Sequence, residues 1–316
     1  MSHAPAEAVP ADRPAVLRDR PAVLRDTAAR SAAQAVAENF PVALRLLPRG
    51  PRGQLARVYA FARFVDDVGD EAPGDRRALL ADIAADLRAA EAEGAARAEG
   101  AAKAEGAAGA GPQLAPVVGL APVLAAGVPV QPFLDLVAAN LQDQDVVRYA
   151  TFDDLLGYCA LSAAPVGRIV LHLAGAATPA NVADSDAVCA ALQVLEHCQD
   201  VGEDARAGRI YLPAAELRAA GVAEAALRGR VTGRPLRRVV ARQVDRAHGQ
   251  LLDGRGLVAR LSGWSRVAVA GYLAGGLATV DALRAAEHGV LEEDVRPAKG
   301  RTAIHALRLI GARHGR

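Results

Sequence analysis

Residues 54–71 read QLARVYAFARFVDDVGDE, a stretch that joins a helical pattern of apolar side chains to a cluster of acids. The apolar side chains recur at intervals of three and four residues, at Leu55, Val58, Tyr59, Ala62 and Val65. Six other segments repeat this pattern: residues 76–87, 133–141, 152–161, 187–201, 236–252 and 264–285. Because no segment shows the alternation of a strand, we predict an all-α protein.

The composition agrees with helices and excludes several classes of protein. Apolar residues make up 52% of the 316-residue chain and aromatic residues only 3%, which disfavours β-sandwiches and barrels. The 37 basic and 36 acidic residues nearly cancel, so no chain-wide field indicates a nucleic-acid partner. The three cysteines form no CxxC pair, which disfavours a disulfide framework or a zinc site and favours a cytoplasmic protein.

Repeats and prolines indicate how the chain is organised. The heptad DRPAVLR occurs at 12–18 and again at 19–25, and we expect residues 1–33 to form a disordered leader. Residues 34–310 are expected to form one helical domain, and residues 311–316 a basic tail. Three Gly-containing hexads predict a surface loop over 93–111, or a frayed extension of a helix. We expect no secretory signal. We also expect no transmembrane segment, since five prolines interrupt the uncharged residues 106–134.

The first acidic cluster is RFVDDVGDE at 63–71. On a helix, Arg63, Asp66, Asp67 and Asp70 fall within an arc of about 100°, so one face would carry three carboxylates and a guanidinium. The same residues also suit a solvated helix end, where like charges one turn apart cost only about 0.2–0.5 kcal/mol. Taken alone, the cluster is compatible with either interpretation.

The second acidic cluster is QVLEHCQDVGED at 193–204. Helical geometry places Gln193, Asp200 and Asp204 within roughly 40° of one another, with Glu196 and Glu203 beside them and apolar side chains opposite. Carboxylates gathered in a partly desolvated cleft would cost several kcal/mol each unless cations compensated them. Mg²⁺ suits such a site, because it prefers oxygen ligands and often bridges carboxylates to phosphates.

Several motifs together resemble a known family. The segment AGRIYLP at 207–213 either directs Arg209 at a phosphate oxygen or simply follows a Gly-terminated helix. The chain resembles the squalene and phytoene synthase family over about Ala37 to Leu309. The stretches that resemble the signatures of this family are the two acidic clusters, QDVGEDARAGRIYLP at 199–213 and YCALSAAPVG at 158–167. Three features are similar to its hopanoid-associated hydroxysqualene synthase branch: ENFPVA at 38–43, SAAPVGRIVL at 162–171, and Gln199 where the condensing enzymes usually carry Arg.

The resemblance implies the all-α isoprenoid synthase fold, with the two clusters facing each other at the mouth of a central cavity. It implies Mg²⁺, or Mn²⁺ in its place, and ionisation of an isoprenoid diphosphate. In the hydroxysqualene branch the substrate is presqualene diphosphate, and water captures the cation to give hydroxysqualene without NADPH. The implied residues are, as catalytic groups, Tyr158, Asp66, Asp70, Asp200 and Asp204; as diphosphate ligands, Arg63, Gln193 and Arg209; and as metal ligands, Asp66, Asp70, Glu196, Asp200 and Asp204.

Three positions keep alternatives open. Tyr158 matches the cavity tyrosine of the family, which would stabilise the cation or position the leaving group, but a plain core tyrosine fits as well. Glu196 stands where the family usually has Asn, so it either adds a Mg²⁺ ligand or marks a drifted function. His197 replaces an aromatic or apolar residue and either handles a proton, orders the quenching water, or is tolerated variation.

Partners and alternatives follow from the same resemblance. Substrate and product are long hydrocarbons, and residues 295–316 contain six basic residues and no acid, so we expect peripheral contact with the inner face of the cell membrane; an ordinary basic tail is the alternative. A presqualene diphosphate synthase and a flavin-dependent reductase are the expected pathway partners. Two other functions stay open: a head-to-head prenyltransferase forming presqualene diphosphate or phytoene, and a non-catalytic partner protein, which the intact motifs disfavour.

Overall fold

The computed structural model describes residues 19–37, 47–98 and 111–311, and within these ranges it is all-α. The one β-type pairing among the described residues is an isolated bridge between Arg148 and Ile210. The N-terminal helices are α1 (Arg20–Ala37), α3 (Arg49–Asp70), α4 (Arg76–Ala98), α5 (Ala115–Val118), α6 (Ala121–Leu124) and α7 (Gln131–Gln142). The all-α prediction is confirmed, and each of the seven periodic segments falls on a helix, although the segment 187–201 is interrupted at Asp200.

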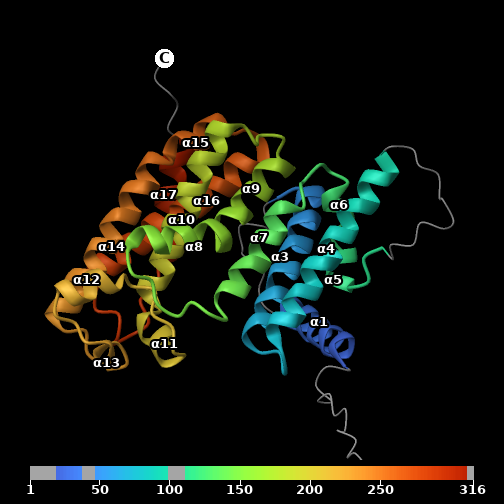
Figure 1. Cartoon of the computed structure of the whole chain (residues 1–316). Coiled ribbons are helices and arrows are strands. Elements are labelled where there is room, and N and C mark those ends of the chain that lie inside the picture. The colour runs from blue at the N-terminus through green and yellow to red at the C-terminus, as the bar shows by residue number, and fades with distance from the viewer. Residues whose placement is uncertain (1–18, 38–46, 99–110, 312–316) are drawn as a thin grey trace, which may run out of the picture.

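The remaining helices form the C-terminal half of the molecule (Figure 1). They are α8 (Phe152–Ser162), α9 (Ala164–Leu173), α10 (Pro179–Gln199), α11 (Val201–Arg206), α12 (Ala214–Ala219), α13 (Glu224–Leu227), α14 (Arg234–Asp253), α15 (Arg255–Arg260), α16 (Gly263–Ala285) and α17 (Lys299–Gly311). Helix α10 is central in this half, since it packs against α8, α9, α14, α15 and α16.

The buried apolar side chains fall into two clusters. The N-terminal cluster joins α1, α3, α4, α5, α6 and α7, and its largest fully buried side chains include Phe61, Phe64 and Phe133. Phe61 and Phe133 meet edge to face, with ring centroids 5.5 Å apart. The C-terminal cluster is built mainly from α8 to α17. Helix α7 contributes to both, with Val137 in the first cluster and Ala139 in the second, so it connects the two halves.

The expected disordered leader is wrong for residues 20–33, which belong to helix α1. This helix packs against α3 and buries Leu24, Thr27 and Ser31 to 2% exposure or less. Burial of these side chains favours the helix despite the proline near its start, because proline is tolerated in a first helical turn. Residues 1–18 of the predicted leader lie outside the described part of the chain.

The other predicted boundaries are also only partly covered. Helix α4 extends through residues 93–98, so this part of the low-complexity tract continues a helix, while 99–110 lie outside the described residues. Of the predicted basic tail, Gly311 ends helix α17 and residues 312–316 are not described.

Two stretches in the described residues have the length and apolar composition of a membrane span, Phe152–Leu173 and Gly263–Ala285. Half of the first window and 61% of the second are buried inside the protein. The first stretch is two helices, α8 and α9, which meet at Ala163. Core helices of this kind pass the same test, so the finding is weak evidence for membrane spans.

Candidate active site

Both acidic clusters line one cavity of about 500 Å³ that lies between the two halves of the molecule. The N-terminal half contributes α3 and α7, and the C-terminal half contributes α8, α10, α11 and the segment after α11. The lining contains eight of the nine predicted site residues: Asp66, Asp70, Tyr158, Gln193, Glu196, Asp200, Asp204 and Arg209. The structure thus brings together side chains that lie up to 143 positions apart in the sequence.

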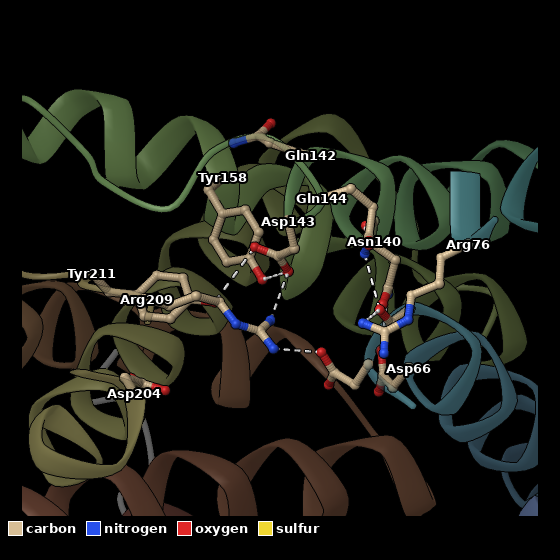
Figure 2. Close-up of polar contacts among 12 residues, drawn as sticks. Asp66, Arg76, Asn140, Gln142, Asp143, Gln144, Tyr158, Asp204, Arg209 and Tyr211 are labelled. Atoms are coloured by element: carbon tan, nitrogen blue, oxygen red, sulfur yellow. Dashed lines mark hydrogen bonds and ion pairs between the residues drawn. The ribbon is translucent and has the colours of Figure 1, made fainter. Parts of the chain in front are cut away.

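The first wall is the last turn of α3, where Asp66 and Asp70 point into the cavity. Asn140 of α7 donates a hydrogen bond from its side-chain nitrogen to Asp66 Oδ1 at 3.0 Å (Figure 2). The approach of α7 requires Gly69, since a Cβ at that position would lie 2.2 Å from Asn140 Oδ1. Partial desolvation by the cavity walls raises the pKa of Asp66 to about 6, and the charges of Asp70 and Asp67 act in the same direction.

The prediction that Arg63 and Asp67 share this acidic face is wrong. Asp67 is 8% exposed and turned toward α1, where Ser31 Oγ donates to its Oδ2 at 2.5 Å. Arg63 Nε lies 3.0 Å from Asp67 Oδ1, and Arg63 is not among the residues that line the cavity. An ion pair one helical turn apart holds the guanidinium beside Asp67, and the role of Arg63 as a diphosphate ligand stays a prediction.

The second wall is formed by the end of α10 and the start of α11. Helical hydrogen bonds continue across the break between them, because Asp200 N–H donates to Glu196 O at 2.9 Å and Asp204 N–H to Asp200 O at 2.8 Å. The carboxylates therefore keep one side in common, as the sequence predicted. Burial raises the pKa of Asp200, and the nearby charges of Asp204 and Glu196 raise it further.

Arg209 reaches across the cavity from the second wall to the first. Gly208, with φ of +93°, ends α11 in the left-handed region that favours glycine, and the next segment runs beside residues 147–150. Arg209 Nη2 donates to Asp70 Oδ1 at 2.5 Å, and its Nη1 lies 3.8 Å from Asp143 Oδ2 (Figure 2). Of the two interpretations left open by the sequence, the structure supports the arginine directed into the cavity.

Asp143, which directly follows α7, is a cavity residue that the motifs did not reveal. Tyr158 Oη donates to Asp143 Oδ2 at 2.7 Å, and Tyr211 Oη lies 3.4 Å from Asp143 Oδ1 (Figure 2). Burial raises the pKa of Asp143, whereas the Tyr158 hydroxyl and Arg209 act to lower it. Burial also raises the pKa of Tyr158, so its hydroxyl remains a donor. Tyr158 is buried, lines the cavity and has its hydroxyl satisfied by Asp143, so both interpretations of this residue stay open.

His197 lies in the same network. Its ring stacks on Tyr211 with centroids 3.7 Å apart and an interplanar angle of 11°. Its Nδ1 is 3.7 Å from Asp204 Oδ2, and its Nε2 is 3.4 Å from the side-chain nitrogen of Gln193. The rings of the cavity residues Tyr158 and Tyr211 and of the buried Tyr149 have centroids within 5.7 Å of one another, so aromatic side chains back the polar wall.

An apolar pocket of about 210 Å³ continues from the acidic cavity and shares Ser162, Gln193 and Glu196 with it. It runs among α9, α10, α15 and α16, and most of its other lining side chains are aliphatic. Gly167 allows α9 to approach α10 here, because a Cβ would lie 2.3 Å from Ser185 Oγ. The site therefore consists of a charged cavity joined to an apolar pocket.

The segment between α16 and α17 borders the second wall. Arg296 lines the cavity from this segment and was not predicted from the sequence. Gln199, which the sequence analysis linked to the fate of the cation, donates from its amide to the carbonyl oxygen of Val295 and is not part of the lining. The Gln199 side chain therefore contacts this segment rather than the cavity.

The donor set of the cavity fits Mg²⁺ bound together with a diphosphate. Asp204 Oδ2 is buried and accepts no hydrogen bond from the described residues, so it is available as an oxygen ligand. Within the described residues no three His, Cys, Asp or Glu side chains form a ready-made metal cage. This arrangement suits Mg²⁺, which commonly takes one or two carboxylates and completes its shell with water and phosphate oxygens.

Comparison with known proteins shows which family the chain matches. The family model described as squalene/phytoene synthase matches residues 33–303. Hydroxysqualene synthase from Rhodopseudomonas palustris is 34% identical over 226 residues, which is 71% of either chain. Hydroxysqualene synthase from Zymomonas mobilis is 33% identical over 235 residues, covering 72% of this chain and 70% of that one.

Solved structures show the same fold. The crystal structure of squalene synthase HpnC from Alicyclobacillus acidocaldarius superposes with a TM-score of 0.71 at 34% identity, covering 85% of this chain and 97% of that one. A dehydrosqualene synthase in complex with ligand gives a TM-score of 0.72 at 21% identity, covering 93% of this chain and 98% of that one. The chain therefore belongs to the squalene/phytoene synthase family and is an isoprenoid synthase with the all-α fold of these enzymes.

Proposed function

We propose that this enzyme converts presqualene diphosphate to hydroxysqualene in squalene and hopanoid biosynthesis. In this reaction the C–O bond to the diphosphate breaks with its electron pair, water adds its oxygen to the rearranged cation, and one proton is lost. The observation that carries the proposal is the charged cavity joined directly to an apolar pocket, which suits a diphosphate head and a hydrocarbon chain. The relatives named hydroxysqualene synthase support this particular product.

In this proposal the carboxylates of Asp66, Asp70, Glu196, Asp200 and Asp204 hold Mg²⁺, with Mn²⁺ as a substitute. The metal would neutralise charge on the departing diphosphate. Arg209 and Gln193 bind diphosphate oxygens, which requires Arg209 to exchange its ion pair with Asp70 for the substrate.

Tyr158 presents its ring to the cation while Asp143 fixes its hydroxyl. His197 lies within the cavity wall close to Asp204 and Gln193, where it orders the water that captures the cation. NADPH has no role in the proposed reaction. A presqualene diphosphate synthase would supply the substrate and a flavin-dependent reductase would consume the product.

The test uses purified protein with Mg²⁺ and no NADPH. Presqualene diphosphate, farnesyl diphosphate and geranylgeranyl diphosphate are supplied in separate reactions, and lipid products are extracted and identified. Hydroxysqualene from presqualene diphosphate alone supports the proposal. Turnover of farnesyl or geranylgeranyl diphosphate alone would instead assign the head-to-head prenyltransferase reaction.

Substitutions at the two walls test the metal ligands. Asp66→Asn and Asp204→Asn should each lower the rate of diphosphate release, because each removes a charged oxygen ligand. Asp135→Asn is the matched control, since this half-buried carboxylate of α7 pairs with Arg168 outside the cavity. Unchanged rates for both cavity variants at saturating Mg²⁺ would exclude their role as ligands.

A further inference from the structure

Helix α17 presents large apolar side chains to solvent. Ile304, Leu307 and Ile310 are 42%, 72% and 39% exposed, whereas Leu309, at 9%, is the one buried residue of this helix. The helix packs on α16 with its other side (Figure 1). On that side Ala306 contacts the core and His305 Nε2 lies 2.9 Å from Asp281 Oδ2. The apolar face is therefore outside the packing interface of α17.

The charges of α17 border this apolar face. At 100° per residue, Ile310, Leu307 and Ile304 lie within an arc of about 120°, and Arg308 and Arg301 follow within about 60° of its edge. Lys299 lies near the opposite edge. Helix α17 contains no acidic residue, and Arg308 has no ion-pair partner among the residues that the structure describes.

We propose that the exposed face of α17, formed by Ile304, Leu307 and Ile310 with Arg308 and Lys299 at its edges, docks on an anionic lipid surface. An amphipathic helix with apolar side chains on one side and basic side chains at the boundary lies in the interface of a bilayer. The basic side chains favour anionic headgroups, and this sign of charge selects lipid over a second copy of the same basic face. The inference deepens the proposed function, because a bilayer is the reservoir for hydrocarbon substrates and products.

The experiment measures sedimentation of the full chain with vesicles of phosphatidylcholine, with and without phosphatidylglycerol, and without substrate. We expect binding to the anionic vesicles only, decreasing as salt is raised. Ile304→Ser/Leu307→Ser should weaken binding about tenfold or more, because it removes two apolar side chains that the bilayer would bury. Arg308→Gln should weaken it about fivefold.

Matched controls come from an exposed loop that carries an aliphatic residue beside an arginine. Val231 is 72% exposed, as Leu307 is, and Arg230 is its exposed neighbour. Val231→Ser and Arg230→Gln should bind vesicles like the unchanged protein. Helical content by circular dichroism verifies that the α17 variants are folded.

Equal vesicle binding by the α17 variants and the controls would overturn the proposal, as would no binding by the unchanged protein. The proposal is also wrong if, without vesicles, Ile304→Ser/Leu307→Ser turns a dimer into a monomer, because the face would then join two copies. Since no turnover is measured, these outcomes are independent of the proposed reaction.

Discussion

Asp143 contacts three cavity side chains, those of Tyr158, Tyr211 and Arg209. We predict that Asp143→Asn lowers kcat/KM for diphosphate release by about 10- to 100-fold, because small misplacements of catalytic groups have effects of this size. Steady-state kinetics measure the change, and Asp135→Asn, within the preceding helix α7, is the control. Rates within twofold of that control would show that Asp143 does not position the site.

The raised pKa of Asp66 predicts a pH-dependent need for Mg²⁺. With a pKa of about 6 in the metal-free protein, this carboxyl is largely protonated at pH 5.5 and ionised at pH 7.5. Protons compete with the metal for the charged form, so the Mg²⁺ concentration for half-maximal rate should rise as pH falls through about 6. Mg²⁺ titrations of activity between pH 5.5 and 7.5 measure it. A constant half-saturation over this range would contradict the prediction.

At the scale of residues, the motifs predicted those side-chain positions that follow from helical geometry alone. The carboxylates of the second cluster share one side because helical hydrogen bonds continue past Asp200. The first cluster was predicted too broadly, because an arc of about 100° on α3 spans both the cavity and the contact with α1. Asn140 and Asp143 lie at the end of an ordinary apolar helix outside the motifs, and the polar run QDQD at 142–145 was their only signal.

At the scale of elements, α1 shows where composition misleads. A repeated heptad rich in Arg and Pro suggested disorder, yet nearly all of its second copy lies in a helix that packs against a separate helix, α3. Helices α5 and α6 are similar: each begins near a proline, at Pro116 and Pro122, so the prolines that exclude one long helix start two short ones. Tertiary contacts decide whether such segments form helices, and a local sequence pattern carries no information about those contacts.

The docking of α1 gives a stability prediction. Leu24 is 2% exposed in the N-terminal apolar cluster, so Leu24→Ala should lower the free energy of unfolding by about 2–3 kcal/mol. Leu307→Ala, at a leucine that is 72% exposed, should change it by less than about 0.5 kcal/mol. Urea unfolding compares the two. If both substitutions have the same small effect, α1 does not pack on α3 in solution.

At the scale of the whole molecule, the cavity exists because the two halves meet at α7. Its walls come from α3 on one side and from α8, α10 and α11 on the other. Helical periodicity could not predict that the two clusters face each other, since it contains no information on contacts between helices. The family resemblance provided that arrangement, and the position of the α16–α17 segment beside the second wall came from the structure alone.

A polar clasp holds that segment in place. Glu292 accepts hydrogen bonds from Thr232 N–H at 2.9 Å and from Thr232 Oγ1 at 2.5 Å, and Arg237 Nη2 lies 2.9 Å from it. Thr232 precedes α14, so the clasp ties the start of α14 to the segment that carries Arg296. Burial acts to raise the pKa of Glu292, but these hydrogen bonds and Arg237 outweigh it and lower the pKa from 4.5 to about 2.

The clasp should therefore contribute to stability in a pH-dependent way. A carboxyl whose pKa is lower in the folded state stabilises the fold above its unfolded value of 4.5, and this contribution is lost as pH falls toward about 2. We predict that Glu292→Gln lowers the free energy of unfolding at pH 7 by about 1 kcal/mol, since the side chain is partly screened by solvent. The gap to the unchanged protein should close between pH 4.5 and 2 in urea unfolding, and Glu293→Gln, at the exposed neighbour outside the clasp, is the control. A gap that stays constant with pH would mean that Glu292 contributes by packing rather than by its charge.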